Sequence, residues 1–236
     1  MSIVDNRFTT SRHARSSLKR GRAREALRDA AGRDADLPAI FGQLREMHPN
    51  RKALERAARR LGKQPGVVRV ALNQAGLTVM ARNVRQATNV KESVELFSED
   101  VILYTTIRIE FRGGFTCYHI GRASFCLHAL ERLIERSAVP VNRPLLPALD
   151  AEFIATVRSF RADAMIADDG EHFLRGVQEG LWAGGIDEIA PEAGWPEGCS
   201  KVPIFSVRTF LSPEEMRPTL WLRWKNDASL RMLDQG

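Results

Sequence analysis

The chain has 236 residues, of which 44% are hydrophobic and 27% are charged. This composition is typical of a globular protein, and the length allows one large domain or two modest ones. No apolar run approaches the roughly 20 residues that cross a bilayer, so we expect no contact with a membrane. The three cysteines are too few for a disulfide framework and odd in number, which predicts a cytoplasmic location.

The charge is distributed unevenly along the chain. Residues 1–90 carry 19 Lys and Arg against 7 Asp and Glu, whereas residues 91–236 carry 16 against 22. An excess of cations in one segment attracts polyanions and raises the rate of association with nucleic acid. The alternative is a solvated basic surface that has no partner. We take nucleic acid as the expected partner and the basic segment as the part that contacts its phosphates.

The N-terminal region is predicted to be helical. Residues 1–17 mix Ser and Thr with Arg, which is the composition of a flexible arm that orders along phosphates. Good helix formers then predict three helices, over residues 18–31, 36–47 and 50–61. Asp36 and Asn50 are the expected N-caps of the second and third helices, because their side chains can accept a hydrogen bond from a free backbone N–H.

Residues 56–74, RAARRLGKQPGVVRVALNQ, are similar to the helix-turn-helix segment of bacterial repressors of the lactose-repressor type. Ala58, Gly62 and Val68 have the spacing that the crossing of two such helices requires. The resemblance implies a recognition helix in the major groove of DNA, where arginine suits guanine and glutamine or asparagine suits adenine. The side chains that it would direct into the groove are Gln64, Arg69 and Asn73.

The same stretch also predicts a β-hairpin. Residues 67–72 and 77–80 are short runs rich in Val and Leu, and Gly76 is well placed to close the turn between them. Both interpretations remain open from the sequence. The side chains expected to contact nucleic acid are Lys19, Arg20, Arg22, Arg59, Arg60, Lys63, Gln64, Arg69 and Asn73.

The remaining residues predict an α+β domain. Residues 83–100 are polar and predict a connector, which gives a domain boundary near residue 90. The expected strands cover residues 101–111, 115–125, 202–211 and 218–224, and the expected helices cover residues 127–137, 150–160 and 172–182. The sequence therefore predicts a basic helical region with a flexible arm over residues 1–90, followed over residues 91–236 by a mainly antiparallel sheet with packed helices.

One predicted helix carries a row of side chains suited to phosphate chemistry. His128, Arg132 and Arg136 stand four residues apart, so they share one helix face. A histidine that exchanges protons beside two cations suits cleavage of a phosphodiester. Residues 124–140 also resemble the HAxxRxxxR helix of RelE-like toxins, including the relatives of BrnT, and the resemblance implies a ribonuclease with these three residues at its catalytic site.

A structural role for the same helix is the alternative. Its arginines can pair with Glu131 and Glu135 above an apolar face, as charged residues commonly do on exposed helices. The repeated Cys-x-His spacing and an acidic cluster could each hold a cation, yet small core cysteines and a solvated loop explain them equally well. These groups are Cys117 with His119, Cys126 with His128, and Asp163, Asp168, Asp169, Glu171 and His172. We expect no metal, and in the absence of a nucleotide-binding fingerprint we expect no cofactor.

The sequence thus favours a nucleic-acid-binding protein without catalytic activity, with DNA as the preferred ligand. The first alternative is a ribonuclease or other nuclease centred on His128. The second is an adaptor subunit whose basic region docks an acidic protein, and a protein partner or a homodimer is compatible with each of these functions.

Overall fold

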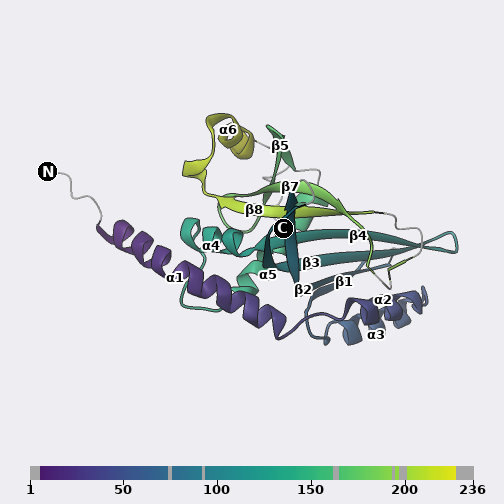
Figure 1. Ribbon diagram of the computed structural model, residues 1–236. Coiled ribbons are helices and arrows are strands. Elements are labelled where there is room, and N and C mark those ends of the chain that lie inside the picture. Colours follow the sequence, from purple (N-terminus) through teal and green to yellow (C-terminus); the bar gives the residue numbers. More distant parts are fainter. Residues whose placement is uncertain are drawn as a thin grey trace. The chain divides into compact units, whose positions relative to one another are not determined.

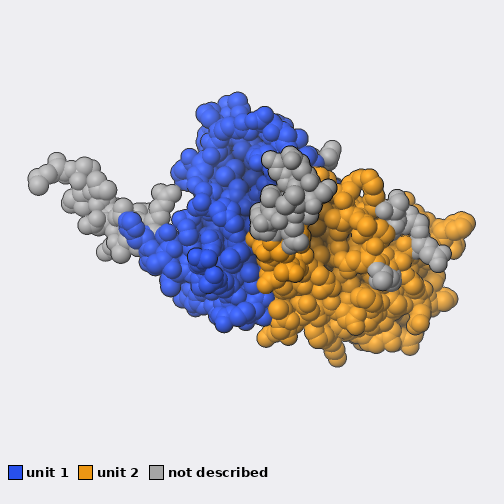
Figure 2. All heavy atoms as spheres, in the orientation of Figure 1, with its two compact units in different colours: residues 1–29, 125–185, 207–236 blue, residues 30–124, 186–206 orange. Residues whose placement is uncertain are grey.

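The computed structural model describes residues 6–73, 76–91, 94–161, 165–192, 195–196 and 201–226, without the side chains of residues 6–12, 89–91, 94–97 and 161. Helices and a large, mostly antiparallel sheet confirm the predicted α+β fold (Figure 1). The residues group into two compact units, which Figure 2 colours separately. Unit 1 comprises Met1–Asp29, Phe125–Gly185 and Val207–Gly236, and unit 2 comprises Ala30–Ser124 and Ile186–Ser206. Among the described residues, no helix is both long and apolar enough to cross a bilayer.

The three N-terminal helices form as predicted, with one correction. They are α1 (Asn6–Ala31), α2 (Leu37–Arg45) and α3 (Arg51–Leu61). The side chain of Asp36 accepts a hydrogen bond from the Ala39 N–H, and that of Asn50 accepts one from the Lys52 N–H, so both predicted N-caps are confirmed. The predicted flexible arm is wrong from residue 6 onward, where α1 has already begun, and residues 1–5 lie outside the described part of the chain.

In the described part of the chain, eight strands form the sheet. They are β1 (Val67–Leu72), β2 (Gly76–Lys91), β3 (Val94–Arg112), β4 (Phe115–Cys126), β5 (Ile166–Asp168), β6 (Glu171–Arg175), β7 (Leu181–Ile189) and β8 (Val202–Leu211). Their order in the sheet is β1-β2-β3-β4-β8-β7-β6-β5. The pairs β1–β2, β2–β3, β5–β6 and β6–β7 are antiparallel, as expected for strands joined by short turns.

The helix-turn-helix interpretation is wrong, and the β-hairpin forms. Residues 67–72, which would have been the recognition helix, are β1, and β1 pairs with β2 in the register Val70↔Val79 and Leu72↔Leu77. Gly66 explains the sharp entry into β1: its φ is 70°, and a Cβ there would lie 2.3 Å from the backbone nitrogen of Ala35. The β-branched side chains and this close approach together favour the strand.

The connector predicted at residues 83–100 is also wrong, because these residues belong to the long β2–β3 hairpin. The two strands pair from Gly76↔Glu110 to Lys91↔Val94. The boundary predicted near residue 90 falls within this hairpin. Polar side chains on both strands made the segment look like a loop, yet backbone pairing with a well-formed neighbour carries a strand beyond its apolar core.

Two C-terminal elements have the opposite type to the predicted one. The helix expected at residues 172–182 is replaced by strands β6 and β7, and the strand expected at 218–224 is the helix α6 (Pro218–Asn226), which follows a short 3-10 turn, η1 (Pro213–Glu215). Helix α5 (Leu146–Arg161) begins earlier than expected, whereas α4 (Leu127–Arg136) confirms its prediction. A short segment of mixed composition fits both the helical and the strand pattern of apolar residues, so its tertiary contacts decide whether it forms a helix or a strand.

In unit 2, helices α2 and α3 cover one face of the sheet (Figure 1). Alternate residues of β2 and β3 point toward the helices, because successive side chains of a strand face opposite sides. The fully buried members of this core include Leu37, Ile40, Phe41, Leu44, Leu61, Leu77, Val79, Ala81, Ile107 and Ile109.

Unit 1 contains a buried carboxylate that organises a turn. Glu152 on α5 is 1% exposed and accepts hydrogen bonds from the backbone N–H groups of Val177 and Gln178 and from the indole N–H of Trp182, at 2.8–3.1 Å. A Cβ on Gly176 would lie 1.7 Å from Glu152 Oε2, so only glycine fits beside the carboxylate. The three donors fix the segment between β6 and β7 against α5.

We expect Glu152→Gln to destabilise the protein by about 1–3 kcal/mol, because the amide supplies one acceptor oxygen and its NH₂ group meets an N–H donor. Urea unfolding measures the change. The control is Glu179→Gln, which alters an exposed glutamate of the same turn and should leave the free energy of unfolding unchanged. Equal stability of wild type and Glu152→Gln would contradict the role given to these hydrogen bonds.

Burial raises the pKa of Glu152, and the three N–H donors oppose the shift without cancelling it. The folded chain therefore retains this proton at pH values where the unfolded chain has lost it. The stabilisation that comes from retaining this proton is then present below the ordinary glutamate pKa of about 4.3 and is lost as the pH rises through the raised, folded-state pKa. The difference in unfolding free energy between wild type and Glu152→Gln, measured from acid to neutral pH, should shrink in that direction. A constant difference would contradict the shift.

Candidate nucleic-acid interface

The outer surface of α3 is set by the residues that it buries. Leu54, Ala57 and Leu61 recur at spacings of three and four and are buried, and Leu61 belongs to the core that α3 shares with the sheet. The opposite face must then point into solvent. In the sequence from Arg51 to Lys63, six Lys and Arg stand against a single acid, Glu55. That glutamate pairs with Arg51 at 3.1 Å, so the remaining cations of the segment are left without it.

Four of these cations form one row, which we call the cation row: Lys52, Arg56, Arg59 and Lys63. They follow one another at intervals of four, three and four residues, which is the spacing of a single helix face. Lys52, Arg56 and Arg59 extend over about 10 Å of α3 at 1.5 Å per residue, and Lys63 follows in the turn after the helix. All four side chains are exposed, and within the described residues none lies at ion-pair distance from a carboxylate. The cation row therefore keeps its charge for an external anion.

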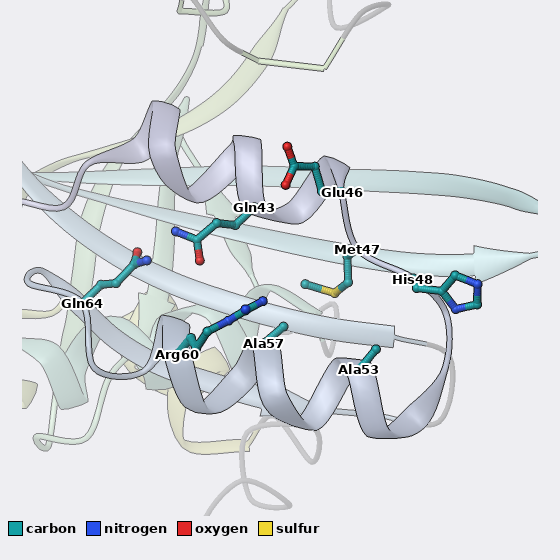
Figure 3. Close-up of a pocket in the computed structure, with 8 residues that line it drawn as sticks. All are labelled: Gln43, Glu46, Met47, His48, Ala53, Ala57, Arg60 and Gln64. Atoms are coloured by element: carbon teal, nitrogen blue, oxygen red, sulfur yellow. The ribbon is translucent and has the colours of Figure 1, made fainter.

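A groove opens between α2 and α3 beside the cation row. Figure 3 shows the amides of Gln43 and Gln64 near one end with the guanidinium of Arg60 between the two helices, while Glu46 and His48 lie toward the other end. The groove has a volume of about 490 Å³. Its remaining lining is apolar and consists of Met47, Ala53 and Ala57. Amide, guanidinium and methyl surfaces thus meet in one open cavity of unit 2.

Of the three α1 side chains predicted to contact nucleic acid, two form ion pairs within the described part of the chain and one does not. Lys19 pairs with Glu135 at 2.8 Å, and Arg22 pairs with Glu25 at 2.7 Å, so neither is a bare cation. Arg20 is exposed and has no ion pair with a described residue. Two further exposed arginines without such a pair, Arg24 and Arg28, continue its row at i+4 and i+8, and the sequence reasoning missed them.

The three residues predicted to contact bases do not share a helix face, because residues 67–72 form the strand β1 and not a recognition helix. Gln64 lines the groove, Arg69 is exposed on β1, and Asn73 follows β1, where its carbonyl oxygen lies 3.4 Å from Arg51 Nη1. No helix carries the three together. Arg59, Arg60 and Lys63 by contrast all lie on α3 or the turn after it, beside the two cations that the prediction missed, Lys52 and Arg56. Their helical spacing was the signal that could have found them.

The predicted catalytic row on α4, His128, Arg132 and Arg136, forms hydrogen bonds and ion pairs within unit 1. Arg132 Nε donates to His128 Nε2 at 3.4 Å and its guanidinium pairs with Glu135, while Arg136 pairs with Glu215 at 2.9 Å and donates to the carbonyl of Phe210 at 2.8 Å. Lys19 and Arg132 both lower the pKa of Glu135, although its burial acts in the opposite direction. Both arginines thus have a carboxylate partner already.

The groups considered as metal ligands do not gather in the described part of the chain. No set of three or more His, Cys, Asp and Glu side chains there could hold a metal ion. Asp168 and Asp169 instead pair with Arg217 at 3.0 and 3.2 Å, and His119 lies 3.9 Å from Glu110. Asp163 lies outside the described residues.

The comparisons with known proteins add no assignment. No protein-family model matches the sequence, and neither the curated proteins nor the solved structures give a match. The geometry of α2 and α3 is therefore the basis for a functional proposal.

We expect Arg136→Met to lower the free energy of unfolding by about 1–3 kcal/mol, because Glu215 and the Phe210 carbonyl lose a charged donor. His128→Ala should change it by no more than about 0.5 kcal/mol, since His128 is an exposed surface side chain. Urea unfolding compares the two variants. Incubation of RNA with wild type and His128→Ala tests the ribonuclease alternative, which requires cleavage that His128→Ala abolishes.

Proposed function

We propose that this protein binds nucleic acid and catalyses no reaction on it. The observation that carries the proposal is the cation row, Lys52, Arg56, Arg59 and Lys63, which is exposed and has no ion pair with the described residues. A row of bare cations neutralises phosphates and releases the counterions condensed on them, which is the main source of affinity for a polyanion. Proteins use such contacts to position a strand whatever its sequence.

The proposed contacts are with phosphates, and no base reading in a major groove is included. The preference for duplex DNA depended on a recognition helix, and β1 occupies those residues. The absence of catalysis is supported by α4, where the two arginines expected to stabilise a transition state have carboxylate partners. A cytoplasmic location suits the free thiols of Cys117 and Cys126.

An acidic protein is the other partner that the cation row could attract, and it would make the chain an adaptor subunit. Nucleic acid is the better match because its charges recur at regular intervals along a chain, as the four cations do along α3 and the turn after it. Carboxylates on a folded partner have no such regular order. The salt dependence of oligonucleotide binding separates the two.

We expect the double variant Arg56→Gln/Arg59→Gln to bind a labelled oligonucleotide more weakly and with a smaller salt dependence. If the four cations each meet a phosphate, wild-type affinity for a single strand should fall about 50-fold between about 50 and 200 mM salt. Removing two of them should make the slope of log K against log salt about 1.4 less negative. Fluorescence anisotropy measures both quantities.

The matched control is Lys201→Gln, which removes another exposed cation of unit 2. Lys201 pairs with Glu188 at 2.6 Å, so its charge is already compensated. Its removal should change neither affinity nor slope. An oligonucleotide that fails to bind wild type at low salt, or one that Lys201→Gln releases as readily as the double variant, would refute the proposal. Circular dichroism establishes that each variant is folded.

A further inference from the structure

The groove between α2 and α3 has a chemistry that the cation row does not explain. Its floor is apolar, with Met47, Ala53 and Ala57, and its polar groups include the amides of Gln43 and Gln64 and the guanidinium of Arg60 (Figure 3). Ligand sites commonly combine an apolar lining with a few polar groups that fix orientation. A flat ring that has apolar faces and hydrogen-bonding edges is the kind of molecule that matches such a lining.

The spacing of small residues explains why the groove is hollow. Ala53 and Ala57 stand one turn apart on the side of α3 that faces α2, so only methyl groups occupy a strip where longer side chains would fill the space. Gln43 on α2 and Met47, which follows the end of that helix, form the facing wall. The volume of about 490 Å³ lies within the range of pockets that hold small organic molecules.

The groove and the cation row occupy adjacent faces of α3. The groove residues Ala53, Ala57, Arg60 and Gln64 each follow a member of the row by one position, and successive residues are about 100° apart around a helix. A strand whose phosphates lie on the row can therefore turn a base toward the groove. We infer that the groove accepts an unpaired base of a single-stranded nucleic acid. This inference depends on the proposed function and adds to it the class of ligand.

The partners on the groove walls suit the edges of a base. Arginine donates to guanine acceptors, and a glutamine amide both donates to and accepts from adenine. Met47 and the two alanines contact the face of the ring. A duplex would first have to release a base from its stack at a cost of a few kcal/mol, and therefore a single strand is the preferred ligand.

The test is Ala53→Leu, which fills the groove without changing any charge. We expect this variant to lose about 5- to 100-fold in affinity for a labelled single strand, the range for losing a hydrogen-bonded contact with a base edge. Its salt slope and its affinity for a duplex of the same length should equal those of wild type. Gln64→Ala removes one amide from the groove wall and should also lower the affinity for the single strand. This second variant tests the inference if Ala53→Leu does not fold.

A strand made of abasic nucleotides gives the sharper control, because it keeps every phosphate and lacks the bases. Wild type should bind it more weakly than the normal strand by about the factor that Ala53→Leu loses, and Ala53→Leu should show no further loss on it. Ala151→Leu, which enlarges an exposed alanine of α5, should bind both strands as wild type does. Thermal unfolding by circular dichroism checks the folding of each variant.

The outcomes distinguish the two proposals. If wild type binds the abasic strand as tightly as the normal one, or if Ala53→Leu and Gln64→Ala retain wild-type affinity, the groove holds no base and the inference fails. Loss of binding in Arg56→Gln/Arg59→Gln would then leave the proposed phosphate contacts standing. If wild type binds no oligonucleotide at low salt, both proposals fail together.

Discussion

The packing of α3 on the sheet is the contact on which the candidate site depends. Leu54, Ala57 and Leu61 are buried, and each leucine removed from water contributes about 1.5–3 kcal/mol. Since a helix repeats every 3.6 residues, burial of that stripe determines which side chains face outward. The cations of α3 are on its outer face because burying an unpaired charge is far more costly than exposing it. The same packing leaves the alanines at the edge of the buried stripe, where α2 approaches and the groove forms.

Cations on α1 and α3 illustrate why a count of charges does not define a binding surface. Both helices are rich in Lys and Arg. On α1, Arg15 donates to the carbonyls of Ile134 in the last turn of α4 and of Val139 after it, and Lys19 pairs with Glu135, so part of the charge holds unit 1 together. On α3 the single glutamate, Glu55, forms an ion pair with Arg51. The charge available to a ligand is what remains after these internal pairs are formed.

Charged groups in unit 1 serve structure in the same way. Glu152 organises the turn between β6 and β7, and Arg136 joins α4 to β8 and to the η1 turn. A row of His128, Arg132 and Arg136 resembles a catalytic arrangement in the sequence because helical spacing brings the three together. Whether such a row is free to act on a phosphate depends on carboxylates from elsewhere in the chain, Glu135 on the same helix and Glu215 far along the sequence.

Local patterns in the sequence determined the helices α2–α4 and the second half of α1, the caps at Asp36 and Asn50, the apolar stripe of α3, the second half of β3, the strand β4 and the α+β class, because each depends on neighbours within a few residues. Tertiary contacts decided the rest. Residues 67–72 suit a helix or a strand, and pairing with β2 selects the strand. Residues 172–182 and 218–224 exchange their predicted types for the same reason. The groove joins side chains of two helices, so no single stretch of sequence contains it, and only the folded chain brings Gln43 and Met47 beside Ala57 and Arg60.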